Sequence, residues 1–182
     1  MAEGEVCRLN WGSGTEPPAD WINCDIKEAP GIDISCDIRD GLPLEDDSID
    51  YAVSIHAFPE LAYPDVEPAM AELRRVLRPG GVLRLSLPDL EKAMNAYREG
   101  NAGYFLVPDD DVRSIGGKLI VQLTWYGYSK SLYTFDFTEE LLYRAGFRRV
   151  VRCGYRETAS EHPGITGLDN RERESLFVDA FK

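Results

Sequence analysis

Glycines and carboxylates stand at the ends of three successive strand-like runs near the start of the chain. Gly12-Ser13-Gly14 follows the first run, and Asp25 and Asp37 close the next two. Glycine lets the backbone approach a ligand closely because it carries no Cβ atom. In an open α/β sheet, ligands bind beyond the carboxyl ends of the strands, where an acidic side chain can bind ribose hydroxyls. This spacing predicts a site for a ligand that contains a nucleoside.

The loop after the glycines indicates which kind of nucleoside this would be. It continues as Thr15-Glu16-Pro17-Pro18, so the third glycine of the dinucleotide pattern is absent. Without that glycine, the tight helix start on which a pyrophosphate binds is not expected. A ligand with a ribose and a base but no phosphate suits this loop better, and S-adenosylmethionine is such a ligand.

His56 is the candidate catalytic base. It lies just beyond the fourth strand-like run, Ile49 to Ile55. An alcohol that acts as a nucleophile must lose a proton, and a histidine with an unperturbed pKa of ~6.5 can accept one near neutrality. The alternative is that His56 only packs against the ligand or the next helix.

Other side chains are weaker candidates. Glu60 and Asp89 could face a second substrate, although an N-cap of the following helix is the stronger interpretation of Asp89. A group of aromatic residues could form a lid over that substrate, although such groups more often belong to the core. Its members are Tyr104, Trp125, Tyr126 and Tyr128.

Short β-rich runs alternate with helical stretches, which predicts an α/β fold with a doubly wound, mostly parallel sheet. Strands are expected at 6–11, 21–25, 32–37, 49–55, 82–87, 147–155 and 175–181, and helices at 67–77, 90–99, 112–123 and 139–145. The last two strands could pair antiparallel at one edge. Pro68 is expected in the first turn of its helix, and Thr138 is expected as an N-cap.

Composition excludes several classes of protein. The 182 residues fit one domain, and the formal net charge of −12 repels the phosphate backbone of nucleic acids. No apolar run approaches the ~20 residues that span a membrane. The start of the chain, Met1 to Glu5, is acidic and lacks the pattern of a signal peptide, so a cytoplasmic location is expected.

Cysteine and histidine usage predicts neither disulfides nor a metal site. Cys7, Cys24 and Cys36 lie in apolar strand-like runs, where cysteine acts as a small buried hydrophobe in a reducing compartment. No CxxC pair occurs, and the two histidines, His56 and His162, are too few for a typical zinc site.

Several of these motifs together resemble a class I S-adenosylmethionine-dependent methyltransferase, in particular the small bacterial type 11 group. The resemblance covers nearly the whole chain, and the Leu-Arg-Pro-Gly-Gly turn before the fifth strand is its most specific part. The residues that carry it are Leu9 to Gly14, the acidic strand ends, Asp47 to Asp50, Leu73 to Gly81, Phe135 to Leu142 and Ala145 to Phe147.

The resemblance implies a seven-stranded sheet with an antiparallel last strand, and it assigns roles to single residues. Gly12, Ser13 and Gly14 would line the methionine part of the cofactor. Asp25 would bind the ribose, Asp37 and Ile38 would contact the adenine, and Ser54, Ile55 and His56 would approach the sulfonium and its methyl group.

The chain departs from the family's pattern at three places. Asn10 replaces the usual acidic residue of strand one, so a charged cofactor contact becomes neutral. The stretch from Gly14 to Trp21 is too short for a full covering helix, so one face of the sheet would be thinly covered. Pro59-Glu60 stands where many relatives carry a Glu-His pair.

The expected function is S-adenosylmethionine-dependent methylation of a small molecule, with an oxygen atom as the preferred acceptor. Residues 1–182 would form one domain, with 90–134 as an insertion on the acceptor side. Two alternatives stay open. One is a non-catalytic or regulatory S-adenosylmethionine-binding domain. The other is a nicotinamide-dependent oxidoreductase, although such an enzyme would require the full dinucleotide glycine pattern. The pattern of residues leaves the oligomeric state undetermined.

Overall fold

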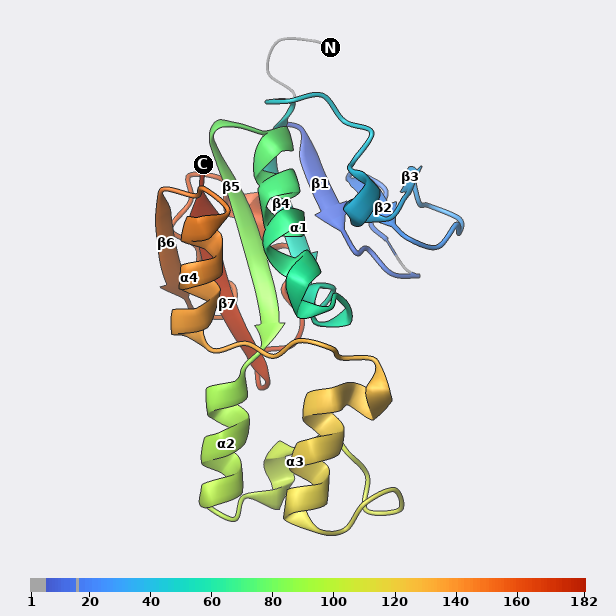
Figure 1. Cartoon of the computed structure of the whole chain (residues 1–182), viewed down its shortest axis with the longest axis vertical. Helices are drawn as coiled ribbons and strands as arrows, with labels where there is room; N and C mark the ends of the chain where they lie inside the picture. The colour runs from blue at the N-terminus through green and yellow to red at the C-terminus, as the bar shows by residue number, and fades with distance from the viewer. Residues whose placement is uncertain (1–5, 16) are drawn as a thin grey trace.

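The protein folds around one seven-stranded sheet (Figure 1). The computed structural model describes residues 6–15 and 17–182, so the predicted absence of a signal peptide in residues 1–5, and Glu16 in the loop, lie outside the described residues. The strands follow the order β3-β2-β1-β4-β5-β7-β6. β7 is antiparallel to β5 and β6, and the other neighbouring pairs are parallel. The predicted fold class is confirmed.

Every expected strand is present; those predicted at 49–55 and 175–181 keep their predicted bounds, and the bounds of the other five differ. The strands are β1 (Arg8–Trp11), β2 (Ile22–Asp25), β3 (Ile34–Ser35), β4 (Ile49–Ile55), β5 (Leu77–Pro88), β6 (Arg149–Cys153) and β7 (Ser175–Phe181). β5 begins five residues earlier than predicted, since a register shift between Ile49 and Tyr51 of β4 accommodates the Pro-Gly-Gly turn within the strand.

The helices are α1 (Tyr63–Val76), α2 (Leu90–Arg98), α3 (Ile115–Thr124) and α4 (Phe135–Arg144), with short 3₁₀ turns η1 (Ile38–Asp40), η2 (Phe58–Glu60), η3 (Ala102–Tyr104), η4 (Trp125–Gly127) and η5 (Pro163–Thr166). Two predicted helix starts are wrong. α1 begins four residues early, with Pro64 in its first turn and Pro68 in its interior. α4 also begins early, and Thr138 is a buried helix residue whose hydroxyl donates to the Thr134 carbonyl.

Helices cover one face of the sheet. Figure 1 shows α1 and α4 side by side in front of the strands. Met70 and Leu73 of α1 are fully buried, and so is Leu77 at the start of β5. No helix lies between β1 and β2 among the described residues, as the short 14–21 stretch predicted.

The opposite face is covered by residues 154–174, here called the 154–174 loop. Ile165 of η5 is fully buried against Tyr51 and Val53 of β4. His162 of the same loop is half-buried, and its ring lies 5.2 Å from that of Tyr51. The loop therefore does the packing that a covering helix would do.

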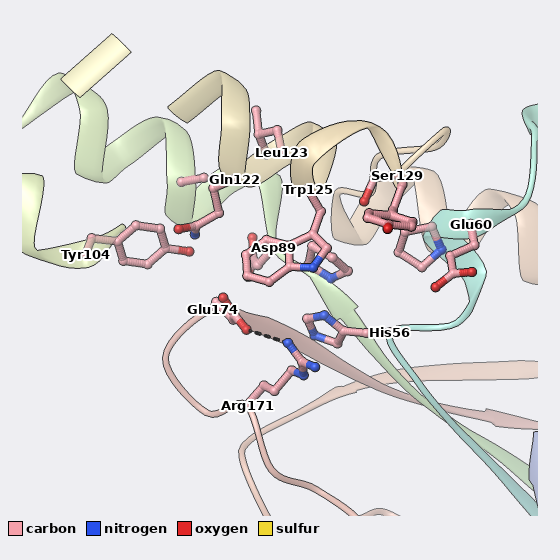
Figure 2. A pocket seen from close by; sticks show the side chains of 14 residues that line it. His56, Glu60, Asp89, Tyr104, Gln122, Leu123, Trp125, Ser129, Arg171 and Glu174 are labelled. Atoms are coloured by element: carbon pink, nitrogen blue, oxygen red, sulfur yellow. Dashed lines mark hydrogen bonds and ion pairs between the residues drawn. The ribbon is translucent and has the colours of Figure 1, made fainter. Parts of the chain in front are cut away.

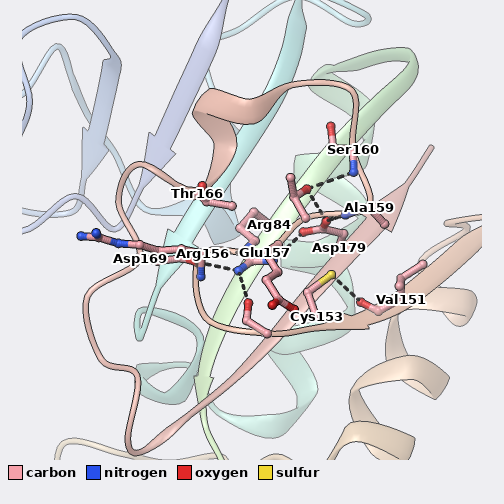
Figure 3. Close-up of polar contacts among 12 residues, drawn as sticks. Arg84, Val151, Cys153, Arg156, Glu157, Ala159, Ser160, Thr166, Asp169 and Asp179 are labelled. Atoms are coloured by element: carbon pink, nitrogen blue, oxygen red, sulfur yellow. Dashed lines mark hydrogen bonds and ion pairs between the residues drawn. The ribbon is translucent and has the colours of Figure 1, made fainter.

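A buried ionic network attaches this loop to the sheet (Figure 3). The Arg84 guanidinium lies 2.6 Å from an Asp169 oxygen and 3.0 Å from an Asp179 oxygen, and all three side chains are fully buried. It also donates to the backbone carbonyls of Gly154 and Glu157. Because Arg84 belongs to β5 and Asp179 to β7, this network joins both ends of the loop to the middle of the sheet.

Residues 90–134, here called the helical unit, extend beyond the carboxyl end of β5 (Figure 1). They contain α2 and α3, which pack around a small separate core that includes Ala93, Ala96 and Phe105. No helix among the described residues is long and apolar enough to cross a membrane.

Candidate functional site

The glycine turn and the second strand end come together as predicted. Gly12 and Gly14 both have left-handed backbone, with φ of 72° and 70°. The backbone N–H groups of Gly12 and Ser13 donate to the Cys24 carbonyl, and the Gly14 N–H donates to the Asp25 carboxylate at 2.9 Å. The turn therefore folds back onto the end of β2, with Asp25 beside it.

The two glycines differ in their surroundings. A Cβ added at Gly12 would lie 2.2 Å from the Cβ of Ala57, whereas a Cβ added at Gly14 would meet nothing within 4 Å. Gly12 thus permits close packing of the loop after β4, and the open space lies beside Gly14. Asp25 is half-buried, and its two carboxylate oxygens accept the backbone N–H groups of Gly14 and Lys27. A carboxylate oxygen has a second lone pair, which can accept a ribose hydroxyl. At Gly14 and Asp25 the residues fit the cofactor.

The residues assigned to the adenine lie at the neighbouring strand end. The Cys36 N–H donates to the Asp25 carbonyl, which joins the third strand end to the second. Arg39 holds the Asp37 carboxylate through side-chain and backbone hydrogen bonds, which lower the pKa of that carboxyl. The Ile38 side chain is only 4% exposed and packs in the main core, so it does not project from the strand end toward a ligand.

Among the remaining predicted cofactor residues, Asn10 and Ser54 are buried, and Ser13 and Ile55 are half-buried. Asn10 donates its side-chain amide to Asn23 at 3.0 Å, so it does not face the glycine turn with a free polar group. Ile55 packs with the apolar cluster beneath the 154–174 loop. The hydroxyl oxygens of Ser13 and Ser54 are buried and have no hydrogen-bond partner among the described residues. Such unsatisfied groups are uncommon in folded proteins and call for a ligand or water.

A pocket opens on the other side of the loop that follows β4, and we call it the acceptor pocket (Figure 2). It contains about 680 Å³ of empty space when the open solvent at its mouth is included. Its walls come from the loop after β4, the end of β5, the helical unit and the 154–174 loop. Its lining includes His56, Glu60, Asp89, Tyr104, Gln122, Trp125, Tyr128, Arg171 and Glu174.

His56 faces this pocket from a strained backbone. Its φ is 54°, a region that non-glycine residues rarely adopt. Its Nε2 atom lies 2.8 Å from the Ser175 hydroxyl oxygen, which fixes the ring. Burial, and then the nearby Arg171 guanidinium, lower the pKa of His56 to about 3. The imidazole is therefore neutral at physiological pH and is a weaker base than an ordinary histidine.

Asp89 is the N-cap of α2 and also lines the acceptor pocket. One carboxylate oxygen accepts the Lys92 N–H at the start of α2, which confirms the N-cap interpretation. The same side chain also lines the acceptor pocket. Glu60 lines the pocket as well, from an exposed position.

Most of the predicted aromatic lid lies at the pocket. Tyr104, Trp125 and Tyr128 line it, and Trp125 and Tyr128 are 38% and 67% exposed, so these two do not belong to the core. Tyr126 points elsewhere, and its hydroxyl donates to Asp111. Burial, followed by the charges of Asp89 and Glu174, raises the pKa of Tyr104 to about 12.

Sequence reasoning missed Arg171 and Glu174. Both lie in the 154–174 loop, far along the chain from the strand ends, and they form an ion pair at 3.4 Å. No motif surrounds them in the sequence. Their position depends on how the loop folds across the sheet, which the buried Arg84 network determines.

The chain was compared with protein-family models, curated proteins and solved structures. Residues 13–85 match the type 11 methyltransferase family model, described as "Methyltransferase domain". No curated protein matches the chain significantly. The family match begins within the glycine turn and ends in β5, so it spans the strand ends that form the predicted cofactor site.

Solved structures share the whole fold. An S-adenosylmethionine-dependent methyltransferase from Mesorhizobium loti is 21% identical, with a TM-score of 0.58 over 98% of this chain and 92% of that one. One from Archaeoglobus fulgidus is 12% identical, with a TM-score of 0.62 over 99% and 87%. The 1,6-didemethyltoxoflavin-N1-methyltransferase of Burkholderia thailandensis, solved with S-adenosylhomocysteine, is 14% identical, with a TM-score of 0.54 over 97% and 71%. Residues 13–85 therefore carry a methyltransferase-domain match, and the chain as a whole shares the fold of these S-adenosylmethionine-dependent methyltransferases.

Proposed function

We propose that the chain is an S-adenosylmethionine-dependent methyltransferase and that it methylates a hydroxyl group of a small molecule bound in the acceptor pocket. One observation carries this proposal: the loop after β4 is a shared wall between the two sites. Ala57 packs against Gly12 of the glycine turn, while its neighbours His56 and Pro59 line the pocket. A donor at the glycine turn and an acceptor in the pocket would therefore meet at this loop.

Gly14 and Asp25 are the proposed centre of cofactor binding, with Asp37 and the Ile38 backbone toward the adenine. The cofactor supplies an activated methyl group on a sulfonium. The chain's own contribution is to hold the acceptor oxygen close to that methyl group, and such positioning can lower a barrier by roughly 7–11 kcal/mol in model reactions. Residues 90–134 would form the acceptor-side cover that excludes water from the pocket.

His56 is proposed to accept the proton of the hydroxyl group. An imidazole with a pKa of about 3 does not deprotonate a free alcohol. As the new O–C bond forms, however, the oxygen gains positive charge and its proton becomes strongly acidic. We therefore propose that the proton reaches His56 late in the reaction, and that the neutral ring first accepts a hydrogen bond from the hydroxyl.

We also propose that the protein acts in the cytoplasm. The net charge of −12 would repel nucleic acids, which supports a small molecule as the acceptor.

Calorimetric titration with S-adenosylmethionine and with NAD tests the assignment of the cofactor site. Asp25→Asn keeps the shape of the side chain and should weaken S-adenosylmethionine binding about tenfold to a hundredfold, since hydrogen bonds to a charged group contribute about 1.5–3 kcal/mol. Glu28→Gln, an exposed change three residues along the chain, is the matched control and should leave affinity unchanged. Unaltered affinity of Asp25→Asn would move the site elsewhere. Binding without turnover of any acceptor would favour a regulatory role.

A further inference from the structure

The charge in the acceptor pocket is unevenly distributed. Figure 2 shows Tyr104 and His56 on opposite sides of Trp125. The carboxylates of Asp89 and Glu174 line the same pocket, and their side chains are only 1% and 10% exposed. Buried carboxylates are screened by water much less than exposed ones, so their negative charge acts strongly inside the pocket.

The neighbouring cations do not cancel this charge. Arg152 pairs with Asp89 at 3.3 Å, but it also pairs with Glu91 at 3.3 Å, so its charge is shared. Arg171 pairs with Glu174, but its side chain is 43% exposed and much of its charge faces water. Taken together, the pocket retains an excess of negative charge.

The two ends of the pocket differ in their electrostatics. At Tyr104, the carboxylates of Asp89 and Glu174 both raise the pKa of the hydroxyl group beyond the effect of burial, and the Arg173 guanidinium opposes them with a smaller effect. At His56, the nearby charge that acts on the ring is the positive Arg171, which adds to the effect of burial. The Tyr104 end is therefore negative, and the His56 end is not.

We propose that the acceptor molecule carries a protonated amine, which binds at the Tyr104 end of the pocket between Asp89 and Glu174. The aromatic faces of Tyr104 and Trp125 suit a cation as well, because the π-face of an aromatic ring carries negative charge. This inference rests on the proposed function, and it orients the acceptor: its amine lies at the Tyr104 end and its hydroxyl group at the His56 end.

The same carboxylates determine which atom is methylated. Nearby negative charge favours the protonated form of an amine. A protonated amine has no lone pair and cannot attack a methyl group, so it anchors the molecule and is not itself methylated. The hydroxyl oxygen forms the new O–C bond and releases its proton. The C–S bond of the donor breaks, and its electron pair remains on the sulfur.

Fragment binding measured by saturation-transfer NMR, without cofactor, tests the charge preference. The probes are small hydroxylated aromatic compounds in three matched sets that bear an ammonium group, a neutral amide or a carboxylate. We expect the ammonium set to bind about tenfold or more tightly than the amide set, and the carboxylate set to bind least. Equal binding of the three sets, or preference for the neutral or anionic set, would overturn the proposal.

Two variants test whether the preference for the ammonium set arises between Asp89 and Glu174. Glu174→Gln should remove most of the advantage of the ammonium set and leave the amide set unchanged. Glu172→Gln is the matched control, because Glu172 lies on the same loop but lines a different cavity beside β7. An equal loss in both variants would assign the effect to overall charge and would contradict a site between Asp89 and Glu174.

Product analysis separates this inference from the proposed function. Amino alcohols that the enzyme turns over should yield O-methylated products that keep a primary amine, as mass spectrometry and NMR can show. An N-methylated product would refute both the anchoring role and the hydroxyl acceptor, while methyl transfer itself would stand. O-methylation of neutral alcohols at equal efficiency would refute the anchor alone and leave the proposed function intact.

Discussion

At the scale of single residues, His56 is where chemistry and backbone strain coincide. We expect His56→Asn to reduce turnover at least about tenfold, because a positioned proton acceptor contributes about 10²–10⁴ in rate. The affinity for S-adenosylmethionine should stay the same. In the wild-type enzyme, a pKa of about 3 keeps the ring neutral, so its protonation should not lower the rate as pH falls through ~6.5, where an ordinary histidine would become charged.

Asparagine is the matched replacement because it tolerates the left-handed backbone that residue 56 adopts. The measurements are a pH–rate profile and a calorimetric titration of each protein. Unchanged turnover of His56→Asn would exclude a proton-transfer role. A loss of wild-type rate centred near pH 6.5 that disappears in the variant would show instead that bound acceptor restores an ordinary histidine pKa.

Gly12 allows a second residue-scale prediction. Gly12→Ala should destabilise the fold, because its Cβ would meet Ala57 at 2.2 Å and because φ is 72°. The left-handed backbone costs roughly 1–2 kcal/mol for a residue with a Cβ, and overpacking costs about 1–3 kcal/mol more. The double variant Gly12→Ala/Ala57→Gly should recover the packing part only, as urea unfolding can measure. No recovery would mean that the two residues do not pack together.

These residues show how far sequence reasoning reached at the site. The neighbourhood of Gly14, Asp25 and Asp37 was predictable, because the carboxyl ends of adjacent parallel strands lie at one edge. The contact between Gly12 and Ala57 was not, since it joins segments 45 residues apart through side-chain packing. The low pKa of His56 could not be predicted from the sequence either, because it results from burial in the folded chain.

At the scale of elements, Arg84 determines how the second face of the sheet is covered. Arg84→Met should lower the free energy of unfolding by about 3–5 kcal/mol, because it leaves Asp169 and Asp179 buried without a counter-charge. Chemical denaturation measures this loss. The triple variant with Asp169→Asn and Asp179→Asn is the control, and it should be more stable than Arg84→Met alone. If the single change cost less than about 1 kcal/mol, the network would not be a buried ionic one.

The strands were predictable from apolar runs, but the network was not. Arg84 lies within an apolar strand, where sequence alone gives no reason to expect a fully buried charge. Helix starts were also missed, because the first turns of α1 and α4 carry proline, threonine and aromatic residues that resemble a loop. Their helical form depends on packing: Phe135 and Phe137 pack against the main core. Tertiary contacts here outweigh local preference.

At the scale of the whole molecule, the helical unit is a separate small structure joined to the sheet at few points. The Lys130 and Ser131 N–H groups donate to the Pro59 carbonyl. The Lys92 ammonium donates to the Ser175 carbonyl, and the Arg173 guanidinium donates to the Gly103 carbonyl. Its own core is small, and Ile120 of α3 is 64% exposed. Segments with little buried apolar surface open more readily than the main core. We therefore expect the helical unit to open more readily than the sheet.

Amide hydrogen exchange tests this division of the molecule. α3 and α4 are matched, with ten residues each, but Leu141 and Leu142 of α4 are buried in the main core. We expect amides of α3 to exchange at least about tenfold faster than those of α4. Because the pocket lies between the helical unit and the sheet, a bound ammonium fragment should slow exchange in α3 and leave α4 unchanged. Equal exchange in the two helices would mean that the protein opens as a single cooperative body, with the acceptor reaching a pocket that does not move.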